Sequence, residues 1–272
     1  MPDTFAHING HRLRYRLQGE GPLAIFGHGL MGSIDALGLD FGELDPLYER
    51  VRLLMYDARG HGQSEGPETP DDYTWEALGR DMAAFAAHHA PGERAIFGGG
   101  SMGAATSLWV ALERPELVRA LVIVAPPPLG HAEMRGPAEH QALQLFDVLS
   151  AAIQNFGFEK TVELAAMLPG GTPEEAEARR QLLLAQTPRT LLPVLRGVVP
   201  PPFHDPEAYR RIAVPPLIVA HEGDGLHPVR AARLLHEAVP GSRLRVAPSS
   251  AYWSTHRSEF VDEVLDFLDR VG

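Results

Sequence analysis

The chain has 272 residues, 44% of them hydrophobic and 22% charged, so it is long enough to bury a sizeable core as an ordinary globular protein. Its formal net charge of −11 argues against nucleic acid or an anionic membrane as the main partner, and the absence of cysteine excludes disulfides and thiolate chemistry. Because the sequence shows neither a signal peptide nor an apolar stretch of about 18 residues, we expect no membrane span and a cytoplasmic protein.

The first half of the chain alternates short apolar runs with amphipathic segments. An Asn9-Gly10 pair between two strand-like runs is a strong signal for a hairpin. Runs typical of buried strands follow at 23–26, 51–56, 95–97 and 121–124, and helices are predicted over 75–90 and 104–112. Buried strands that alternate with helices are typical of a parallel sheet covered by helices.

This alternation is interrupted after the prolines at 126–128. The segment before the next strand-like run, 217–220, contains helical candidates separated by proline and glycine, at 137–156, 159–168, 173–186 and 188–199. A helix at 230–238, a strand at 243–247 and a closing helix at 259–271 then resume the earlier pattern. We therefore predict an α/β fold with a mostly parallel, doubly wound sheet, in which residues 1–126 and 214–272 form the core and residues 127–213 form an inserted helical cap.

The glycine-rich turn at residues 99–103 reads Gly-Gly-Ser-Met-Gly and fits the G-x-S-x-G pattern of a nucleophile elbow. A serine at a sharp corner between a strand and a helix needs small neighbours, because a Cβ there would clash with the returning chain. The helix that follows points its unpaired N–H groups at the serine, where they favour a developing oxyanion. Taken alone, the pattern fits an ordinary strand–helix turn equally well; the rest of the chain favours a nucleophile.

Three further stretches carry related patterns. Residues 28–32 read His-Gly-Leu-Met-Gly, residues 57–64 read Asp-Ala-Arg-Gly-His-Gly-Gln-Ser, and Gly223-Asp224 precede Pro228. With the turn at 99–103, and in this order, they resemble an α/β-hydrolase of the capped, single-chain esterase, lactonase and C–C hydrolase type. The resemblance covers essentially the whole chain, and its first part looks most like the enol-lactonase branch.

The resemblance implies roles for particular residues. Ser101 would be the nucleophile, and the backbone N–H groups of Leu30 and Met102 would form the oxyanion hole. Asp224, just after a predicted strand, would orient the catalytic imidazole, with Glu222 as its rival two residues earlier. The alternative for Asp224 is a loop residue that caps the next helix.

The turn at residues 57–64 contains an aspartate, a histidine and a serine, which together suggest a catalytic triad. Triads assemble from separate loops, and three members within one glycine-rich turn do not fit that geometry. In the family this turn is a hydrogen-bonded brace. We therefore assign Asp57, His61 and Ser64 to structure.

The catalytic base departs from the family pattern. The usual histidine follows the last strand, and counting along the chain places it near Ser250 or Tyr252, neither of which is histidine. His256 is the histidine that follows that strand, so we predict it as a displaced base, although it could also be a surface residue at the start of the closing helix. His28 and His227 remain alternatives at the same rim of the sheet.

The function predicted from these residues is a serine hydrolase. It would cleave a small or medium carboxylic ester, lactone, thioester or C–C bond of a small-molecule substrate through an acyl-enzyme on Ser101, with no cofactor and no metal. The alternative is a protein on the same scaffold that has lost hydrolysis and either binds a ligand or catalyses a non-hydrolytic step. The sequence does not indicate an oligomeric state. Apolar cap residues could line a substrate pocket or form the core of the cap itself, namely Met134, Leu145, Phe146, Phe156, Phe158 and Met167.

Overall fold

A computed structural model describes residues 3–35, 44–130, 132–166, 173–198 and 205–271. In these ranges, strands form one eight-stranded sheet in the order β1-β2-β4-β3-β5-β6-β7-β8. Their bounds are Thr4–Ile8 (β1), His11–Gln18 (β2), Leu23–Gly27 (β3), Arg52–Tyr56 (β4), Ala95–Gly100 (β5), Val118–Val124 (β6), Pro216–His221 (β7) and Arg243–Ala247 (β8). The strands from β4 to β8 in this order pair in parallel, whereas β1 and β2 pair antiparallel.

The predicted hairpin joins β1 and β2. Asn9 and Gly10 both have positive φ, of 47° and 87°, so that Ile8 pairs with His11 across a two-residue turn. Turns of this kind match the right-handed twist of the flanking strands, and asparagine followed by glycine adopts them most easily. The hairpin extends the antiparallel edge of an otherwise parallel sheet.

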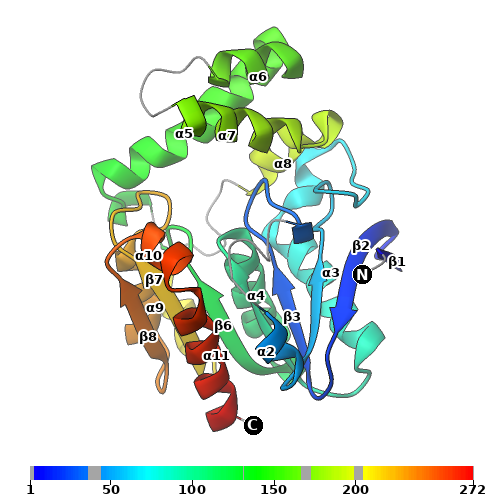
Figure 1. Ribbon diagram of the computed structural model, residues 1–272, viewed down its shortest axis with the longest axis vertical. Helices are drawn as coiled ribbons and strands as arrows, with labels where there is room; N and C mark the ends of the chain where they lie inside the picture. The colour runs from blue at the N-terminus through cyan, green and yellow to red at the C-terminus, as the bar shows by residue number, and fades with distance from the viewer. Residues whose placement is uncertain (1–2, 36–43, 131, 167–172, 199–204, 272) are drawn as a thin grey trace.

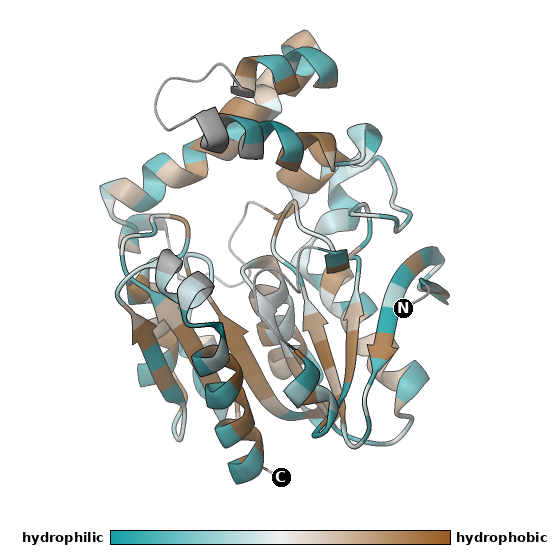
Figure 2. Cartoon of the chain, in the orientation of Figure 1, coloured by the Kyte–Doolittle hydropathy of each residue, from teal (hydrophilic) through white to brown (hydrophobic). Residues whose placement is uncertain are grey.

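Helices cover both faces of the sheet (Figure 1). Helices α3 (Trp75–His89), α4 (Met102–Glu113) and α9 (Val229–Ala238) pack on one face, and α2 (Asp45–Tyr48) and α11 (Arg257–Val271) pack on the other. Successive residues of each strand point to opposite faces of the sheet and pack in two separate hydrophobic cores, as Ile25 and Phe26 of β3 do. Figure 2 shows that the central strands are hydrophobic along their length, as burial on both faces requires, whereas α11 alternates between hydrophilic and hydrophobic residues. The predicted α/β fold is therefore confirmed.

Four helices between β6 and β7 lie beyond the carboxyl ends of the parallel strands (Figure 1): α5 (Pro137–Phe156), α6 (Phe158–Ala166), α7 (Pro173–Leu184) and α8 (Pro188–Val198). The same part of the chain contains the 3₁₀ helices η3 (Ala132–Met134) and η4 (Pro206–Arg211), and η4 packs against α4 and α9 on one face of the sheet. The ends predicted for α6 and α8, residues 167–168 and 199, lie outside the described residues. No helix of the described segments is long and apolar enough to cross a membrane.

These helices share a small core of their own that includes Met31 from the strand side, with Leu30 packed against it. Ile153, Leu191 and Leu195 pack with Met31, which follows β3. Hydrogen bonds add to this contact, because Gln186 Nε2 donates to the carbonyl oxygen of Met31 at 2.8 Å. The helical segment is thereby held over the loop that follows β3.

Six short helices of the described chain were not predicted from the sequence, namely α2, η1 (Pro70–Tyr73), η2 (Pro115–Leu117), η3, η4 and α10 (Ser250–Thr255). The 3₁₀ helix η1 packs against α8, and α10 occupies the stretch between β8 and α11. Tyr, Trp, Ser and Thr have modest helix propensity, so the sequence of α10 gives little local signal. As a result, α11 begins at Arg257, earlier than the predicted 259.

Candidate active site

Ser101 occupies the corner between β5, which ends at Gly100, and α4, which begins at Met102. Its backbone has φ of 51° and ψ of −107°, a region that costs free energy for a residue with a Cβ. Two hydrogen bonds hold this conformation: its N–H donates to Val124 O at 3.0 Å, and its carbonyl accepts from Ala105 N at 3.0 Å. The strained corner lifts the hydroxyl out of the sheet, as a nucleophile elbow does.

The glycines of the elbow allow α4 to approach β3 closely. A Cβ at Gly103 would lie 2.0 Å from the carbonyl oxygen of Gly27, and one at Gly99 would lie 2.2 Å from the same atom. Gly99 also has a φ of 152°, which side chains disfavour. The predicted need for small residues around Ser101 therefore has a definite cause, which is the backbone of β3.

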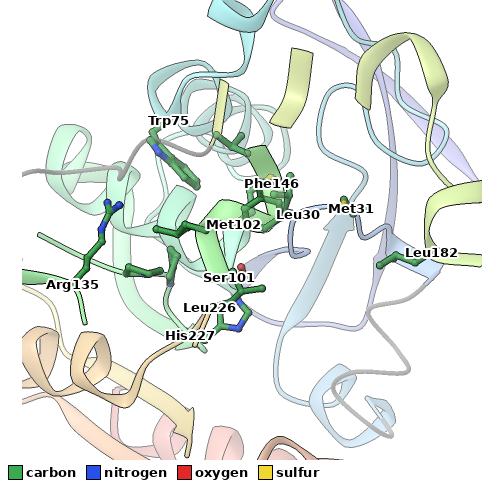
Figure 3. Close-up of a pocket in the computed structure, with 14 residues that line it drawn as sticks. Leu30, Met31, Trp75, Ser101, Met102, Arg135, Phe146, Leu182, Leu226 and His227 are labelled. Atoms are coloured by element: carbon green, nitrogen blue, oxygen red, sulfur yellow. Dashed lines mark hydrogen bonds between the residues drawn. The ribbon is translucent and has the colours of Figure 1, made fainter. Parts of the chain in front are cut away.

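The imidazole beside Ser101 belongs to His227. Its Nε2 lies 2.8 Å from Ser101 Oγ, and its Nδ1 lies 2.7 Å from Asp224 Oδ2. With Nδ1 protonated and donating to the carboxylate, Nε2 is free to accept the hydroxyl proton. Figure 3 shows His227 next to Ser101 at the edge of the cavity. Serine, histidine and aspartate thus form a continuous chain of contacts.

Asp224 and His227 lie in one short loop between β7 and α9. Asp224 Oδ1 accepts the backbone N–H of Leu226 at 2.8 Å and that of His227 at 3.2 Å. These bonds turn the loop back on itself, so that the imidazole three residues after the aspartate reaches the carboxylate. Asp224 and His227 are therefore positioned by the same turn.

A second imidazole shares the carboxylate. His221, the last residue of β7 and buried there, places its Nε2 3.1 Å from Asp224 Oδ2. Burial would raise the pKa of Asp224, but the hydrogen bonds from His221 and His227, the charge of His227 and the N–H of Leu226 together hold that pKa far below its usual range. Asp224 is therefore firmly ionised. The sequence reasoning missed His221, whose one signal was its place at the end of a buried strand.

His256 lies away from Ser101. It follows α10 and is exposed, and its ring stacks on Tyr252 with the ring centroids 4.1 Å apart. Its Nδ1 lies 2.9 Å from Thr255 Oγ1 and 3.1 Å from Tyr252 O. The structure thus does not fulfil the expectation that an imidazole nitrogen of His256 lies beside Ser101. The physical reason is α10, which holds His256 at the surface while the β7–α9 loop supplies His227.

His28 is a structural residue. Its Nε2 accepts the backbone N–H of Ala58 at 3.0 Å, and its Nδ1 lies 2.7 Å from Gly29 O, to which it donates. Both ring nitrogens are therefore occupied. Burial lowers the pKa of His28 to about 4, so the ring stays neutral near pH 7. It cannot accept a proton from Ser101 without breaking these bonds.

The turn at residues 57–64 is a hydrogen-bonded brace, as we expected. Asp57 accepts the backbone N–H groups of Ile34 and Gln63 at 2.7 and 2.9 Å. Ser64 Oγ donates to the carbonyl of Asp57 at 2.6 Å, which ties the two ends of the turn together. His61 is buried with its Nδ1 3.0 Å from Arg59 O, and burial lowers its pKa to about 3. None of these three groups contacts Ser101 within the described ranges.

Leu30 and Met102 line the cavity together with Ser101. Met102 is the first residue of α4, so its N–H points along the helix axis towards the space above the serine. Leu30 lies in the loop after β3, which is tied to α4 by the bond from Gly103 N to His28 O at 3.0 Å. Neither N–H group has a hydrogen-bond partner among the described residues. Both N–H groups are therefore free to donate a hydrogen bond to an oxygen atom of a bound molecule.

Glu222, the rival of Asp224, points elsewhere. Its side chain is 55% exposed and its nearest ionic partner is Arg233, at 3.9 Å. It makes no contact with an imidazole of the described chain. Within the same ranges, no group of histidines and carboxylates is arranged so that it could hold a metal ion.

The cavity above Ser101 has a volume of about 220 Å³ and is mostly apolar (Figure 3). Its walls come from both parts of the chain: Leu30, Trp75 and Met102 lie on the strand side, and Leu143, Phe146 and Leu182 on the helical side.

Of the cap residues that the sequence suggested for a pocket, Phe146 lines this cavity. Leu145 and Phe156 are instead 58% and 61% exposed, and Phe158 packs in the core of the helical segment. Met134 lies near Gly130, away from the cavity walls, and Met167 is outside the described residues.

Comparison with known proteins places this chain in a family. The model of the α/β hydrolase fold family matches residues 22–254. A 2-hydroxy-6-oxo-6-(2'-aminophenyl)hexa-2,4-dienoic acid hydrolase of Metapseudomonas resinovorans is 27% identical, over 98% of this chain and 91% of its own length.

Among solved structures, a hydrolase of Pseudomonas aeruginosa PA01 superposes with a TM-score of 0.77 and 26% identity over 98% of each chain. The enol-lactonase of Burkholderia xenovorans LB400 gives a TM-score of 0.77 with 21% identity, over 98% of this chain and all (100%) of its own. The second likeness concerns the fold alone.

Proposed function

The chain belongs to the α/β hydrolase fold family and is a hydrolase, and from this premise we propose that it is a serine hydrolase in which His227 activates Ser101. The observation that carries the proposal is the series of contacts from Ser101 Oγ to His227 at 2.8 Å and on to Asp224 at 2.7 Å. A hydroxyl is a poor nucleophile until a base takes its proton, and these contacts supply the base and its orienting carboxylate. His227 therefore replaces His256 in our account.

The chain order is the one this fold uses. The nucleophile comes first, the acid follows β7, and the base comes after the acid. What differs is the separation: the base follows Asp224 by three residues, in the same loop, instead of lying beyond β8. The requirement on a triad is geometric, so a base from either loop can serve.

Each step in the formation of the acyl-enzyme can be assigned to a particular residue. Ser101 Oγ attacks the carbonyl carbon while His227 Nε2 accepts its proton, and Asp224 stabilises the imidazolium that forms. The N–H groups of Leu30 and Met102 donate to the oxyanion of the tetrahedral intermediate. Collapse of this intermediate breaks the bond to the leaving group, which takes the proton from His227 and leaves an acyl group on Ser101.

The second half of the reaction repeats these roles. His227 takes a proton from water, and the resulting hydroxide attacks the acyl carbon. The second oxyanion is held by the same two N–H groups, and its collapse returns the proton to Ser101 and releases a carboxylic acid. Because the cavity is small and mostly apolar, we propose a small or medium carboxylic ester, lactone, thioester or C–C substrate.

The alternative, a protein that has lost hydrolysis, drew its support from the lack of a histidine near Ser250. The contact between Ser101 and His227 removes that support, since a base is present at hydrogen-bond distance. The exposed position of His256 no longer counts against hydrolysis.

A fluorophosphonate probe tests the nucleophile. It should add one adduct per chain, located on Ser101 by peptide mass spectrometry, and Ser101→Ala should abolish both labelling and ester turnover. Ser250→Ala is the matched control, because this exposed serine lies outside the cavity and its loss should change neither readout. Labelling or turnover that persists in Ser101→Ala would remove the proposal.

A further inference from the structure

One charged side chain stands in the wall of the cavity above Ser101. Among the described residues that line it, Arg135 is the sole one with a permanent charge, and the remaining lining is apolar apart from Ser101 and His227. In Figure 3, Arg135 lies on the side of Trp75, with Ser101 between Arg135 and Leu182. A substrate seated on Ser101 would therefore share the cavity with a guanidinium group.

This guanidinium has no counter-charge among the described residues. Arg135 Nε is fully buried without a hydrogen-bond partner, and no ion pair joins the side chain to another described residue. The carboxylate of Glu139, four residues along, is already bound by Arg230 at 2.9 Å. A buried donor on a cation is costly to leave unpaired, so the arrangement favours a ligand that supplies the missing acceptor.

The two fully buried arginines of the described residues, Arg14 and Arg59, are paired with carboxylates. Arg14 contacts three aspartates, including Asp57 at 3.2 Å, and Arg59 binds Asp81 at 2.6 Å. Arg14 and Arg52 also have a buried Nε without a partner, but both bond through their Nη atoms, whereas no hydrogen bond or ion pair joins the Arg135 side chain to a described residue.

The guanidinium of Arg135 indicates which kind of anionic group the ligand carries. A guanidinium offers two parallel N–H groups that match the two oxygens of a carboxylate. A phosphate carries more charge and is usually held by several cations or by a helix N-terminus, whereas a single cation balances one carboxylate. The cavity wall presents one cation among its described residues, which fits a monoanionic group.

We propose that Arg135 binds a carboxylate carried by the substrate, so that the enzyme selects carbonyl compounds with a second, anionic group. This inference rests on the proposed role of Ser101 and adds the substrate class. The reacting carbonyl is positioned over Ser101, and the carboxylate is held by Arg135 at the other end of the bound molecule. Arg135 then determines specificity and takes no part in proton transfer.

The test compares matched substrates that differ in one carboxylate. On the acyl side, 4-nitrophenyl hemisuccinate, hemiglutarate and hemiadipate are compared with the 4-nitrophenyl alkanoates of equal chain length. On the leaving-group side, 3-carboxyphenyl acetate is compared with phenyl acetate. The wild-type enzyme should favour the anionic member by kcat/KM in at least one pair, and the preferred chain length reports the span from Ser101 to Arg135.

Variants then assign the preference to Arg135. Arg135→Met should lose about 10- to 100-fold in kcat/KM on the anionic member, mainly through KM, and little on the neutral member. Arg135→Lys should keep part of the preference, because it retains the charge but not the paired donors. Arg180→Met is the control, since Arg180 pairs with Glu177 on the outside of α7 and should change nothing.

A binding measurement makes the test independent of turnover. In the Ser101→Ala background, 4-phenylbutyrate should bind at least about tenfold more tightly with Arg135 present than with Arg135→Met, as measured by calorimetry. Equal binding in the two proteins, a wild-type preference for the neutral esters in both series, or equal losses on both members of a pair would each overturn the inference. If no ester is turned over but 4-phenylbutyrate still depends on Arg135, the proposed hydrolysis fails while the carboxylate site stands.

Discussion

Replacement of Asp224 by asparagine should remove most of the activity while leaving the fold intact. The amide oxygen of asparagine can still accept the backbone N–H groups of Leu226 and His227, so the loop keeps its turn. The amide nitrogen, however, then faces His227 Nδ1 as a donor, and the imidazole must carry its proton on Nε2 instead. In that tautomer Nε2 cannot accept the proton of Ser101.

The size of this effect follows from the contacts that are lost. The wrong tautomer disables the base, and an equivalent change in a serine protease costs about 10⁴-fold in kcat, or about 5 kcal/mol of transition-state free energy. KM should change little, because Asp224 does not line the cavity. Hydrolysis of 4-nitrophenyl butyrate gives both constants, and circular dichroism checks the fold.

Glu222→Gln is the matched control for Asp224→Asn. The side chain of Glu222 is 55% exposed and lies in the same loop, so its amide should leave kcat unchanged. A kcat for Asp224→Asn within tenfold of wild type, or a large loss in Glu222→Gln, would refute the assignment of the acid.

Two further predictions concern stability. Burial lowers the pKa of His28 to about 4 and that of His61 to about 3, so both stay neutral in the folded protein. In the unfolded chain each imidazole binds a proton near pH 6.5. The free energy of unfolding should therefore be full above pH 6.5 and should fall as the pH drops towards 4, by about 1.4 kcal/mol per pH unit for each histidine. Urea midpoints measured between pH 7.5 and 4.5 check this, and an unchanged dependence of the midpoint on pH in His61→Gln would contradict it. Gly103→Ala should lower the free energy of unfolding by at least about 2 kcal/mol, because its Cβ would lie 2.0 Å from Gly27 O. Gly136→Ala, with open space around its Cβ, should change that free energy little, and equal urea midpoints for the two variants would show that the close approach of α4 to β3 is unimportant.

The fold could be read from the sequence because its signals are local. The buried strands are continuous apolar runs, the Asn9-Gly10 turn specifies a hairpin, and the glycines around Ser101 mark a close backbone approach. The division into a core and a cap at residues 126 and 214 stays a prediction. The short helices η1 and α10 were missed because few of their residues favour a helix and packing decides their conformation.

The site was predictable as far as it is local. Ser101 is marked by its own turn, and Asp224 by its place after a buried strand. The proposed base, His227, is not marked in this way, because its position depends on how the loop at residues 222–228 folds over the sheet. The family order led to His256, whereas two backbone hydrogen bonds to Asp224 bring His227 to the serine. A histidine three residues after the candidate acid was the available signal.

His221 and Arg135 illustrate what sequence patterns omit. His221 reads as the end of a buried strand, and only the loop geometry brings it to within 3.1 Å of Asp224 Oδ2. Arg135 reads as one charged residue among many near the start of a helical segment. Its proposed role in substrate binding comes from the apolar cavity that it lines and from the lack of a carboxylate partner among the described residues.

The central claim is that His227 is the base for Ser101, and the most direct measurement is kcat for His227→Ala beside His256→Ala. We predict that His227→Ala loses nearly as much as Ser101→Ala, at least about 10³-fold, since members of such a unit are strongly non-additive. His256→Ala should retain the wild-type kcat, because its ring lies at the surface against Tyr252. Loss of turnover in His256→Ala with activity retained in His227→Ala would contradict the account.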